Sequence, residues 1–426
     1  MSDSHHAQRR RLLSDLFRDY GGPPFAVRLW NGWQWVSLPG ERPVFTVVVE
    51  TPSALTSLMA EPTEISLGEA FIQKDIDVEG DIFSVFSVAE YLVNRPRGLL
   101  QRAREFFARV AVNTGRRMNS GFQHSKARDR ASISYHYDQP VEFFRPWLGS
   151  TLAYSCAYFR SAHDSLDLAQ CQKLELICQK LRLQPLERFL DIGCGWGSLI
   201  LHAAGRHAVH AHGITLSRIQ EEVAQDRIEQ AELGHRCQVE LRDYRDCGPL
   251  IGSFDKIASI GMFEHVGLRN LPEYFRMVRG LLRPGGVFLN HGIARSPSSP
   301  IRKDSFIDRY VFPDGRLVTL SEATTTAEAA GFEIRDVENL REHYELTLRK
   351  WVEGLRRNQE TLRNHVSETT YRIWLLYMAG SAAAFHRGDI AVYQILLSRT
   401  NQGHSQLPLT REDWYVESSQ DQRITV

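Results

Sequence analysis

A glycine-rich segment, Asp191-Ile192-Gly193-Cys194-Gly195-Trp196-Gly197, lies where a predicted strand passes into a predicted helix. Glycines permit a tight turn there and let a ligand approach the backbone closely. The G-x-G-x-G spacing is not the G-x-G-x-x-G of dinucleotide-binding turns. Taken alone, the segment is compatible either with a ligand site or with a tight turn that binds nothing.

Side chains able to hold or transfer a proton follow this segment, namely Glu264, His291 and Tyr344. Each also has a purely structural explanation. Glu264 could belong to a helix start, His291 at a strand end could be a satisfied core histidine, and Tyr344 precedes a predicted helix. Only their combination with other motifs distinguishes a catalytic from a structural role.

The elements that must position these residues begin near residue 174, where short apolar strands alternate with helical patterns. We expect strands at 188–192, 209–216, 238–241, 254–260 and 287–290, and helices at 199–204, 220–233 and 271–282. Arg283-Pro284-Gly285-Gly286 is expected to close the last helix. This alternation implies a parallel, doubly wound α/β sheet, whose ligands lie at the carboxyl ends of its strands.

The end of the second of these strands is unusual for a nucleotide-binding sheet. An Asp or Glu usually stands there to hold ribose hydroxyls. Here the strand ends Gly213-Ile214-Thr215-Leu216-Ser217, so Thr215 and Gln220 are the available polar groups. A neutral strand end indicates either a particular subgroup of such folds or no ligand.

Charge is segregated along the chain, although 51 Lys and Arg residues balance 51 Asp and Glu residues. A net charge of zero argues against a general nucleic-acid binder. From Arg95 to Arg130 the chain carries ten basic and two acidic residues, with apolar residues at helical spacing among them. Such a segment is typical either of an amphipathic helix on an anionic membrane surface or of a surface helix that docks on a neighbouring domain.

Three parts are expected from these patterns. Residues 1–115 indicate a small α+β domain, 116–134 a basic linker, and 135–426 the α/β domain. No apolar run approaches the roughly 20 residues that span a bilayer, and the N-terminus has no signal-peptide pattern, so we expect a cytoplasmic protein. The six cysteines include no C-x-x-C pair, so neither a metal site nor a disulfide framework is expected.

Six motifs follow one another in a fixed order along the chain. They are Tyr154-Ser155-Cys156-Ala157-Tyr158-Phe159, Leu190 to Gly197, Gly213 to Ser217, Asp243-Tyr244-Arg245-Asp246, Gly261-Met262-Phe263-Glu264-His265-Val266-Gly267 and His291-Gly292-Ile293. With these motifs the chain closely resembles the cyclopropane fatty acid synthases and the mycolic acid methyltransferases over roughly residues 130 to 400. Its N-terminal part resembles the lipid-binding domain of the phospholipid-directed members.

The resemblance implies a Rossmann-like S-adenosylmethionine-dependent methyltransferase domain with a smaller N-terminal α+β lipid-binding domain. It places S-adenosylmethionine against nine residues: Tyr154, Ser155, Gly193, Cys194, Gly195, Thr215, Gln220, Tyr244 and Arg245. It also implies a bicarbonate ion held by five others: Cys156, Glu264, His291, Ile293 and Tyr344. Ser381 stands where some bacterial members carry a cysteine once considered a nucleophile, so covalent catalysis through a thiol is not available there.

The implied reaction suits these residue types. A cis double bond attacks the sulfonium methyl and leaves a carbocation, which must lose a proton to close a cyclopropane ring. Bicarbonate can take that proton, while Tyr158, Phe159 and Phe263 can stabilise positive charge without being alkylated. The expected substrates are unsaturated phospholipids, reached by peripheral contact with the inner face of the membrane, and a homodimer is implied.

Two alternatives stay open at this point. The same methyl transfer could end, after a hydride shift and proton loss, in a methylene-branched chain of equal mass. A non-enzymatic lipid-binding protein on a methyltransferase scaffold is the other alternative, and the intact glycines and the five bicarbonate positions argue against it.

Overall fold

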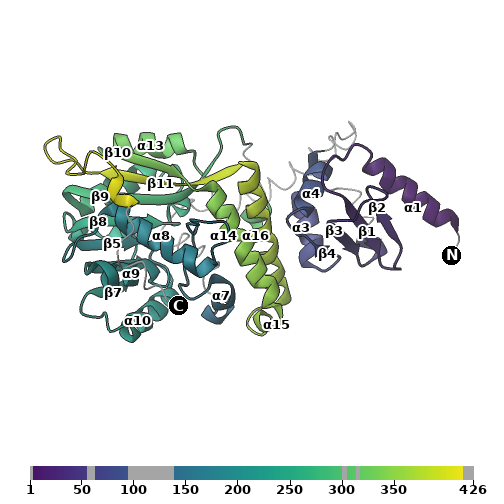
Figure 1. The fold of residues 1–426 in the computed structure, drawn as a ribbon, viewed down its shortest axis with the longest axis horizontal. Helices are drawn as coiled ribbons and strands as arrows, with labels where there is room; N and C mark the ends of the chain where they lie inside the picture. The colour runs from purple at the N-terminus through teal and green to yellow at the C-terminus, as the bar shows by residue number, and fades with distance from the viewer. Residues whose placement is uncertain (1–2, 55–62, 95–138, 300–304, 313–316, 416–426) are drawn as a thin grey trace, which may run out of the picture. The chain divides into compact units, whose positions relative to one another are not determined.

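The structure is a computed structural model that describes residues 3–54, 63–94, 139–299, 305–312 and 317–415. The chain forms two compact units (Figure 1). The first comprises Met1–Gln123, Ile301–Pro313 and Val366–Ala383, and the second comprises the remaining three segments. The sequence-based division places 301–313 and 366–383 in the α/β domain, whereas the structure groups both with the N-terminal unit. The linker 116–134 and the basic segment 95–130 lie outside the described residues.

The N-terminal unit contains a four-stranded sheet with the order β2-β1-β3-β4. β1 and β3 are parallel and the other neighbours are antiparallel. Thr63 begins α3 with a reciprocal capping box to Ser66. The elements are α1 (Asp3–Leu16), β1 (Phe25–Leu29), β2 (Gln34–Val36), β3 (Phe45–Val49), α3 (Glu64–Ile72), β4 (Ile76–Gly80), α4 (Val85–Asn94) and α12 (Phe306–Tyr310).

The N-terminal part of helix α16 (Glu368–Arg387) belongs to this unit, and Arg372 of that helix makes the contact. Arg372 is buried, and its guanidinium donates hydrogen bonds of 2.6 and 3.0 Å to the carbonyls of Phe71 and Ile76. The guanidinium carbon also lies 4.0 Å from the centroid of the Phe71 ring. A buried charge satisfied by backbone carbonyls holds together segments about three hundred residues apart in sequence.

The second unit contains a seven-stranded sheet with the order β10-β11-β9-β8-β5-β6-β7. β5 to β9, the five strands expected from the sequence, run parallel as predicted, whereas β11, which was not expected, is antiparallel to both of its neighbours. The strands are β5 (Arg188–Ile192), β6 (His210–Thr215), β7 (Cys237–Leu241), β8 (Phe254–Ile260), β9 (Leu282–Arg295), β10 (Glu333–Asn339) and β11 (Ile390–Ser398).

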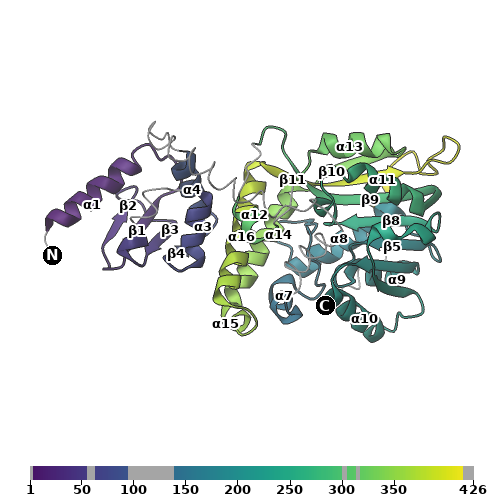
Figure 2. The ribbon, with the colours of Figure 1, turned by 180° about the vertical axis from the view of Figure 1, so that it is seen from behind.

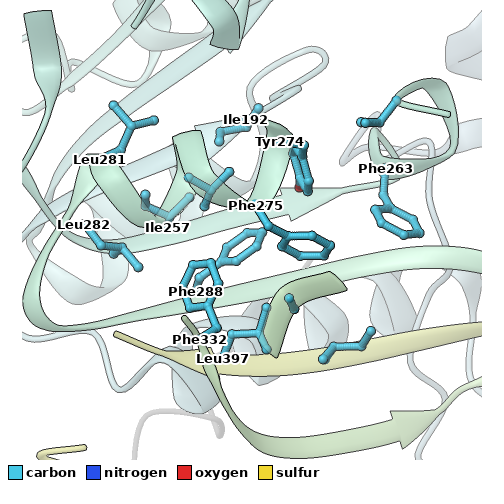
Figure 3. Close-up of a cluster of buried hydrophobic side chains, with 14 of the residues drawn as sticks. Ile192, Ile257, Phe263, Tyr274, Phe275, Leu281, Leu282, Phe288, Phe332 and Leu397 are labelled. Atoms are coloured by element: carbon cyan, nitrogen blue, oxygen red, sulfur yellow. The ribbon is translucent and has the colours of Figure 1, made fainter. Parts of the chain in front are cut away.

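Helices cover both faces of this sheet, as the front and back views show (Figures 1 and 2). Alternate strand residues serve two hydrophobic clusters: Leu190 packs with α11 and α13, whereas Phe189 packs with α8 and α9. In the first cluster Phe275, Phe288 and Phe332 lie together between α11 and the strands (Figure 3). The helices are α7 (Val141–Leu148), α8 (Leu166–Leu181), α9 (Ser198–His207), α10 (Arg218–Gln230), α11 (Leu271–Leu281), α13 (Leu320–Ala329), α14 (Arg341–Arg357) and α15 (Gln359–Leu362). The doubly wound α/β fold class is confirmed.

The Pro-Gly-Gly segment has a different role from the one expected. Helix α11 ends at Leu281, and residues 283–286 form an irregularity inside β9 rather than a separate helix cap. The register with β8 moves from Phe254 opposite Leu282 to Lys256 opposite Val287. Among the described residues, no helix is both long enough and apolar enough to cross a membrane.

Candidate functional site

A pocket lies at the carboxyl ends of β5, β6 and β8. The connections from β5 lead outward to β6 and β7 on one side, while β8 lies on its other side, so the strand order reverses between β5 and β8. Ligands of open α/β sheets bind in the crevice at this kind of reversal. The pocket is the strongest candidate ligand site in the described part of the chain.

The glycine-rich turn after β5 forms one wall of this pocket. Gly193, Gly195 and Gly197 all have positive φ angles, of 83°, 54° and 83°. A Cβ atom added at Gly193 would lie 2.9 Å from Cβ of Met262, on the loop after β8. The turn therefore needs glycine at residue 193 both for its backbone conformation and for its packing.

All nine residues predicted to contact S-adenosylmethionine line this one pocket. The buried Thr215 hydroxyl donates a 2.8 Å hydrogen bond to the amide oxygen of Gln220, so the neutral end of β6 is internally paired. Arg245 is held by the Asp243 carboxylate through bonds of 2.9 and 2.6 Å. The nine residues are Tyr154, Ser155, Gly193, Cys194, Gly195, Thr215, Gln220, Tyr244 and Arg245.

Two buried charged residues also line the pocket: Asp191, the first residue of the glycine-rich segment, and Lys173, which no sequence motif indicated. Lys173 of α8 donates a 2.9 Å hydrogen bond to the hydroxyl of Ser155, and burial lowers its pKa to about 8. Burial raises the pKa of Asp191 to about 7, and the charge of Lys173 partly opposes that rise. Oδ1 of Asp191 is buried with no hydrogen-bond partner among the described residues. A buried acceptor of this kind is a group that a ligand could satisfy.

Glu264 and Ile293 of the predicted bicarbonate set are in direct contact. The Ile293 backbone N–H donates a 2.7 Å hydrogen bond to Oε1 of Glu264. Oε2 is buried, and no residue in the described ranges bonds to it. Burial raises the pKa of Glu264 to about 7, although the bonds from backbone N–H groups act in the opposite direction. The carboxyl group is therefore held between its two protonation states near neutral pH.

His291 lies two residues before Ile293 on β9, so both side chains are on the same face of the strand. It is fully buried, and burial together with the charges of Lys173 and Lys180 lowers its pKa to about 3. Its Nδ1 lies 3.3 Å from the amide nitrogen of Gln394, while its Nε2 has no partner within the described part of the chain. The imidazole is consequently neutral.

Cys156 and Tyr344 are both tied to α14. The buried Cys156 thiol approaches the carbonyl of Leu340 at 3.8 Å, directly before that helix, and burial raises its pKa above the ordinary value. Tyr344 packs against Phe385 at 4.7 Å between ring centroids. The Ala157 N–H donates a 3.0 Å hydrogen bond to the hydroxyl of Thr347 in the same helix.

The five bicarbonate residues are therefore placed in two groups, one at β9 and one at α14. All five are described, and none of them lines the pocket that holds the nine. The two sets are nonetheless adjacent along the chain, since Cys156 follows Ser155 and Glu264 stands between Met262 and His265, which line the pocket. Ser381 is buried in α16, within the N-terminal unit.

One group of potential metal ligands lies apart from these residues, although cysteine spacing predicts no metal site. Atoms of Cys178, His202 and His207 that could bind a metal lie within 4.8 Å of one another. Nε2 of each histidine also lies 2.9 or 3.3 Å from the same carboxylate oxygen of Glu175, whose pKa they lower. A carboxylate shared by two imidazoles explains this group without an ion.

Comparison with known proteins agrees with the site. The family model described as "Mycolic acid cyclopropane synthetase" matches residues 124–395. The chain belongs to this family. A second model, described as a domain of unknown function, matches residues 12–94. The resemblance predicted from the six motifs is confirmed, and the chain is an S-adenosylmethionine-dependent methyltransferase.

Named relatives match from about three fifths to more than nine tenths of the chain. A "Probable fatty acid methyltransferase" of Pseudomonas putida is 39% identical over 397 residues, which cover 92% of this chain and 96% of the relative. The "Cyclopropane-fatty-acyl-phospholipid synthase" of Escherichia coli K12 is 38% identical over 264 residues, covering 62% and 66%.

Solved structures match the methyltransferase part. The cyclopropane synthase MmaA2 of Mycobacterium tuberculosis is 31% identical, with a TM-score of 0.60, covering 63% of this chain and 97% of that one. The mycolic acid cyclopropane synthase CmaA1, solved with SAH and CTAB, is 33% identical, with a TM-score of 0.59 and coverage of 63% and 97%.

Proposed function

We propose that this enzyme transfers a methylene group from S-adenosylmethionine to the cis double bond of unsaturated phospholipid acyl chains, forming cyclopropane fatty acids, with bicarbonate as the base. The observation that carries the proposal is the pairing of two sites. All nine predicted cofactor residues line one pocket, and the buried Oε2 of Glu264 and Nε2 of His291 have no hydrogen-bond partner among the described residues.

The residues of the pocket fit S-adenosylmethionine. The glycine turn lets a ligand approach the backbone. Oδ1 of Asp191, buried and without a partner in the described part of the chain, can accept from a donor such as a ligand amine or hydroxyl. Tyr154 is braced by Trp351 of α14, with the ring centroids 5.2 Å apart, so its ring is held firmly at the pocket wall. We infer that Thr215, Gln220 and Tyr244 contact the nucleoside part.

The residues at β9 fit a small oxyanion. His291 Nε2 offers an N–H donor, and Glu264, with its pKa near neutrality, can donate a proton when protonated. We infer that Cys156 and Tyr344 complete the set from α14. When bound, S-adenosylmethionine supplies an electrophilic methyl group, and bicarbonate supplies a base that alkylation does not consume.

Aromatic side chains are part of the proposal, because aromatic faces stabilise positive charge by cation–π attraction and do not trap it. We infer this role for Tyr158 and Phe159, which follow Cys156 in the chain. Phe263 is buried, and a Cβ added at Gly292 of β9 would lie 2.8 Å from its ring. Its ring therefore packs on the face of β9 opposite the side chains of His291 and Ile293.

Two further statements belong to the proposal. The enzyme acts at the inner face of the membrane by peripheral contact, which the basic composition of 95–130 supports, and it functions as a homodimer. The methylene-branched product stays a second candidate, because a relative called "Tuberculostearic acid methyltransferase UfaA1" is 35% identical over 288 residues.

The test is methyl transfer to vesicles. The full-length protein is incubated with methyl-labelled S-adenosylmethionine, bicarbonate and vesicles of cis-monounsaturated phosphatidylglycerol and phosphatidylethanolamine. Label should enter the acyl chains of these vesicles but not those of fully saturated vesicles. A protein that binds the vesicles without labelling any unsaturated lipid would be the lipid-binding scaffold instead.

A further inference from the structure

Three buried polar side chains, those of Lys180, Gln394 and His291, are linked in series by polar contacts. Nζ of Lys180, on α8, donates a 2.7 Å hydrogen bond to Oε1 of Gln394 on β11. Nε2 of Gln394 lies 3.3 Å from Nδ1 of His291 on β9. Each of the three side chains is only 1% exposed. Buried polar side chains that hydrogen-bond to one another in this way hold each other in a single conformation.

The pairing of β11 with β9 brings the side chains of Gln394 and His291 together. Gln394 and His291 are directly opposite each other in the antiparallel β11–β9 ladder, so their side chains lie on the same face of the sheet. Lys180 reaches them from the last turn of α8, which packs on that face. Three elements therefore contribute one residue each.

Lys180 determines the orientation of the Gln394 amide. An ammonium group has three donors and no acceptor, so it must face the amide oxygen rather than the amide nitrogen. The amide NH₂ of Gln394 is then left to face His291 and can only donate to it. Nδ1 of His291 is consequently the acceptor, and the single ring proton of the neutral imidazole lies on Nε2.

The positive charge of Lys180 is itself balanced. Its ammonium contacts the Glu338 carboxylate and lies 3.9 Å from the carboxylate of Asp336. Trp414 lies beneath it, with the ring centroid 5.5 Å from Nζ. The lysine is thus anchored on one side by acidic groups and directs its remaining donor at Gln394.

We propose that Lys180 and Gln394 are positioning residues that hold His291 in the neutral tautomer with its Nε2–H directed at the oxyanion. This inference rests on the proposed function, because the oxyanion is the bicarbonate of that proposal. Lys180 and Gln394 touch neither ligand, and they act only through the imidazole. Fixing the tautomer in advance spares the enzyme the cost of reorganising the donor when the ion binds.

The first test reads the tautomer directly in the full-length protein by ¹⁵N–¹H correlation of ¹⁵N-histidine side chains, with His291→Gln to assign the signals. His291 of the parent should show protonated Nε2 and unprotonated Nδ1. In Gln394→Glu the new carboxylate accepts from the ring, so the proton should move to Nδ1 or the ring should carry both protons. A parent with its proton on Nδ1, or a Gln394→Glu tautomer identical to the parent's, would overturn the proposal.

The second test separates positioning from general damage. Gln394→Glu should raise the KM for bicarbonate at least 10-fold and change the affinity for S-adenosylhomocysteine less than 2-fold. Gln394→Met serves if Gln394→Glu does not fold, and it should give mixed tautomers with a similar KM effect. A rise in the bicarbonate KM that is matched by an equal loss of affinity for S-adenosylhomocysteine would contradict the proposal. If the parent enzyme shows no bicarbonate dependence, the proposed function fails, and the tautomer measurement still decides the role of Gln394.

Discussion

Oε1 of Glu264 accepts a 2.7 Å hydrogen bond from the backbone N–H of Ile293, and this bond joins the short helix after β8 to β9. The second oxygen, Oε2, is buried and unbonded throughout the described residues. One half of the carboxyl group is therefore structural, and the other half is available to a ligand.

Replacement of Glu264 by Gln should damage catalysis more than cofactor binding. The amide keeps the size of the side chain and an acceptor for the Ile293 N–H, but it cannot exchange a proton with the ion. We expect kcat to fall at least about 100-fold. The Kd for S-adenosylhomocysteine, measured by calorimetry, should change less than about 2-fold, since Glu264 does not line the cofactor pocket. Equal losses in both would show that Glu264 holds the cofactor.

The same variant should change how stability depends on pH. The folded-state pKa of Glu264 is about 7, above its ordinary 4.5, so the native state binds the proton more tightly than the unfolded state. Below pH 4.5 the carboxyl group is protonated in both states and does not lower the free energy of unfolding. As the pH rises to about 7, burial of the carboxyl group lowers the free energy of unfolding increasingly. The full cost corresponds to up to about 3 kcal/mol. Glu264→Gln should therefore gain stability relative to the parent between pH 5 and 8, as measured by urea unfolding. A constant difference over this range would contradict the raised pKa.

Two glycines of the turn after β5 should tolerate alanine unequally. At Gly193 the methyl group would meet Met262 at 2.9 Å, whereas at Gly195 no atom lies within 4 Å. Both substitutions carry the cost of a positive φ, about 1 kcal/mol. Gly193→Ala should weaken S-adenosylhomocysteine binding more than 10-fold, and Gly195→Ala, the matched control, less than 10-fold. The reverse order in calorimetric titrations would mean that the turn does not shape the pocket as described.

Arg372 should be essential for the N-terminal unit. Arg372→Met removes two hydrogen bonds from a buried guanidinium, to the carbonyls of Phe71 and Ile76, and its ion pair with Asp77, at a cost of about 3 kcal/mol. The matched control is Lys74→Met, which removes an exposed 3.4 Å ion pair with Glu368 and should cost less than about 1 kcal/mol. Hydrogen exchange of the β4 amides would measure both. Unchanged protection in Arg372→Met would show that residues 366–383 are not part of this unit.

Membrane contact should depend on salt. If the basic segment 95–130 meets anionic lipid, binding to vesicles rich in phosphatidylglycerol should weaken strongly as ionic strength rises from about 0.05 to 0.5 M. Neutral phosphatidylcholine vesicles are the control. Binding that is equal on both vesicle types and insensitive to salt would exclude an electrostatic contact.

Local patterns predicted the central sheet well. β5 and β8 have the bounds expected from the sequence, because apolar residues bounded by turn signals define a buried parallel strand. β10 and β11 were not placed. β10 is only partly buried along its length, so its sequence lacks a clear apolar period. The antiparallel pairing of β11 with β9 depends on tertiary packing, which no local pattern indicates.

Only those site residues that belong to recognisable motifs were predicted from the sequence. Nine residues carried over by resemblance line one pocket, but Lys173, Lys180 and Gln394 were missed. Lysines beside an apolar helical stripe ordinarily reach solvent. Here Ser155 and Glu338, distant in sequence, accept their hydrogen bonds, and no local pattern contains that information. For the same reason Arg372 gave no sign that its helix joins the N-terminal unit.

NMR of the product shows whether the enzyme converts the double bond of a lipid chain into a cyclopropane ring. Full-length enzyme is incubated with S-adenosylmethionine, bicarbonate and cis-monounsaturated phospholipid vesicles, and the fatty acid methyl esters are then released. We expect upfield ring-methylene protons, in an amount that matches the cofactor consumed and falls when bicarbonate is removed. Olefinic CH₂ protons in place of the ring signal would contradict it, as would the absence of any methylated product.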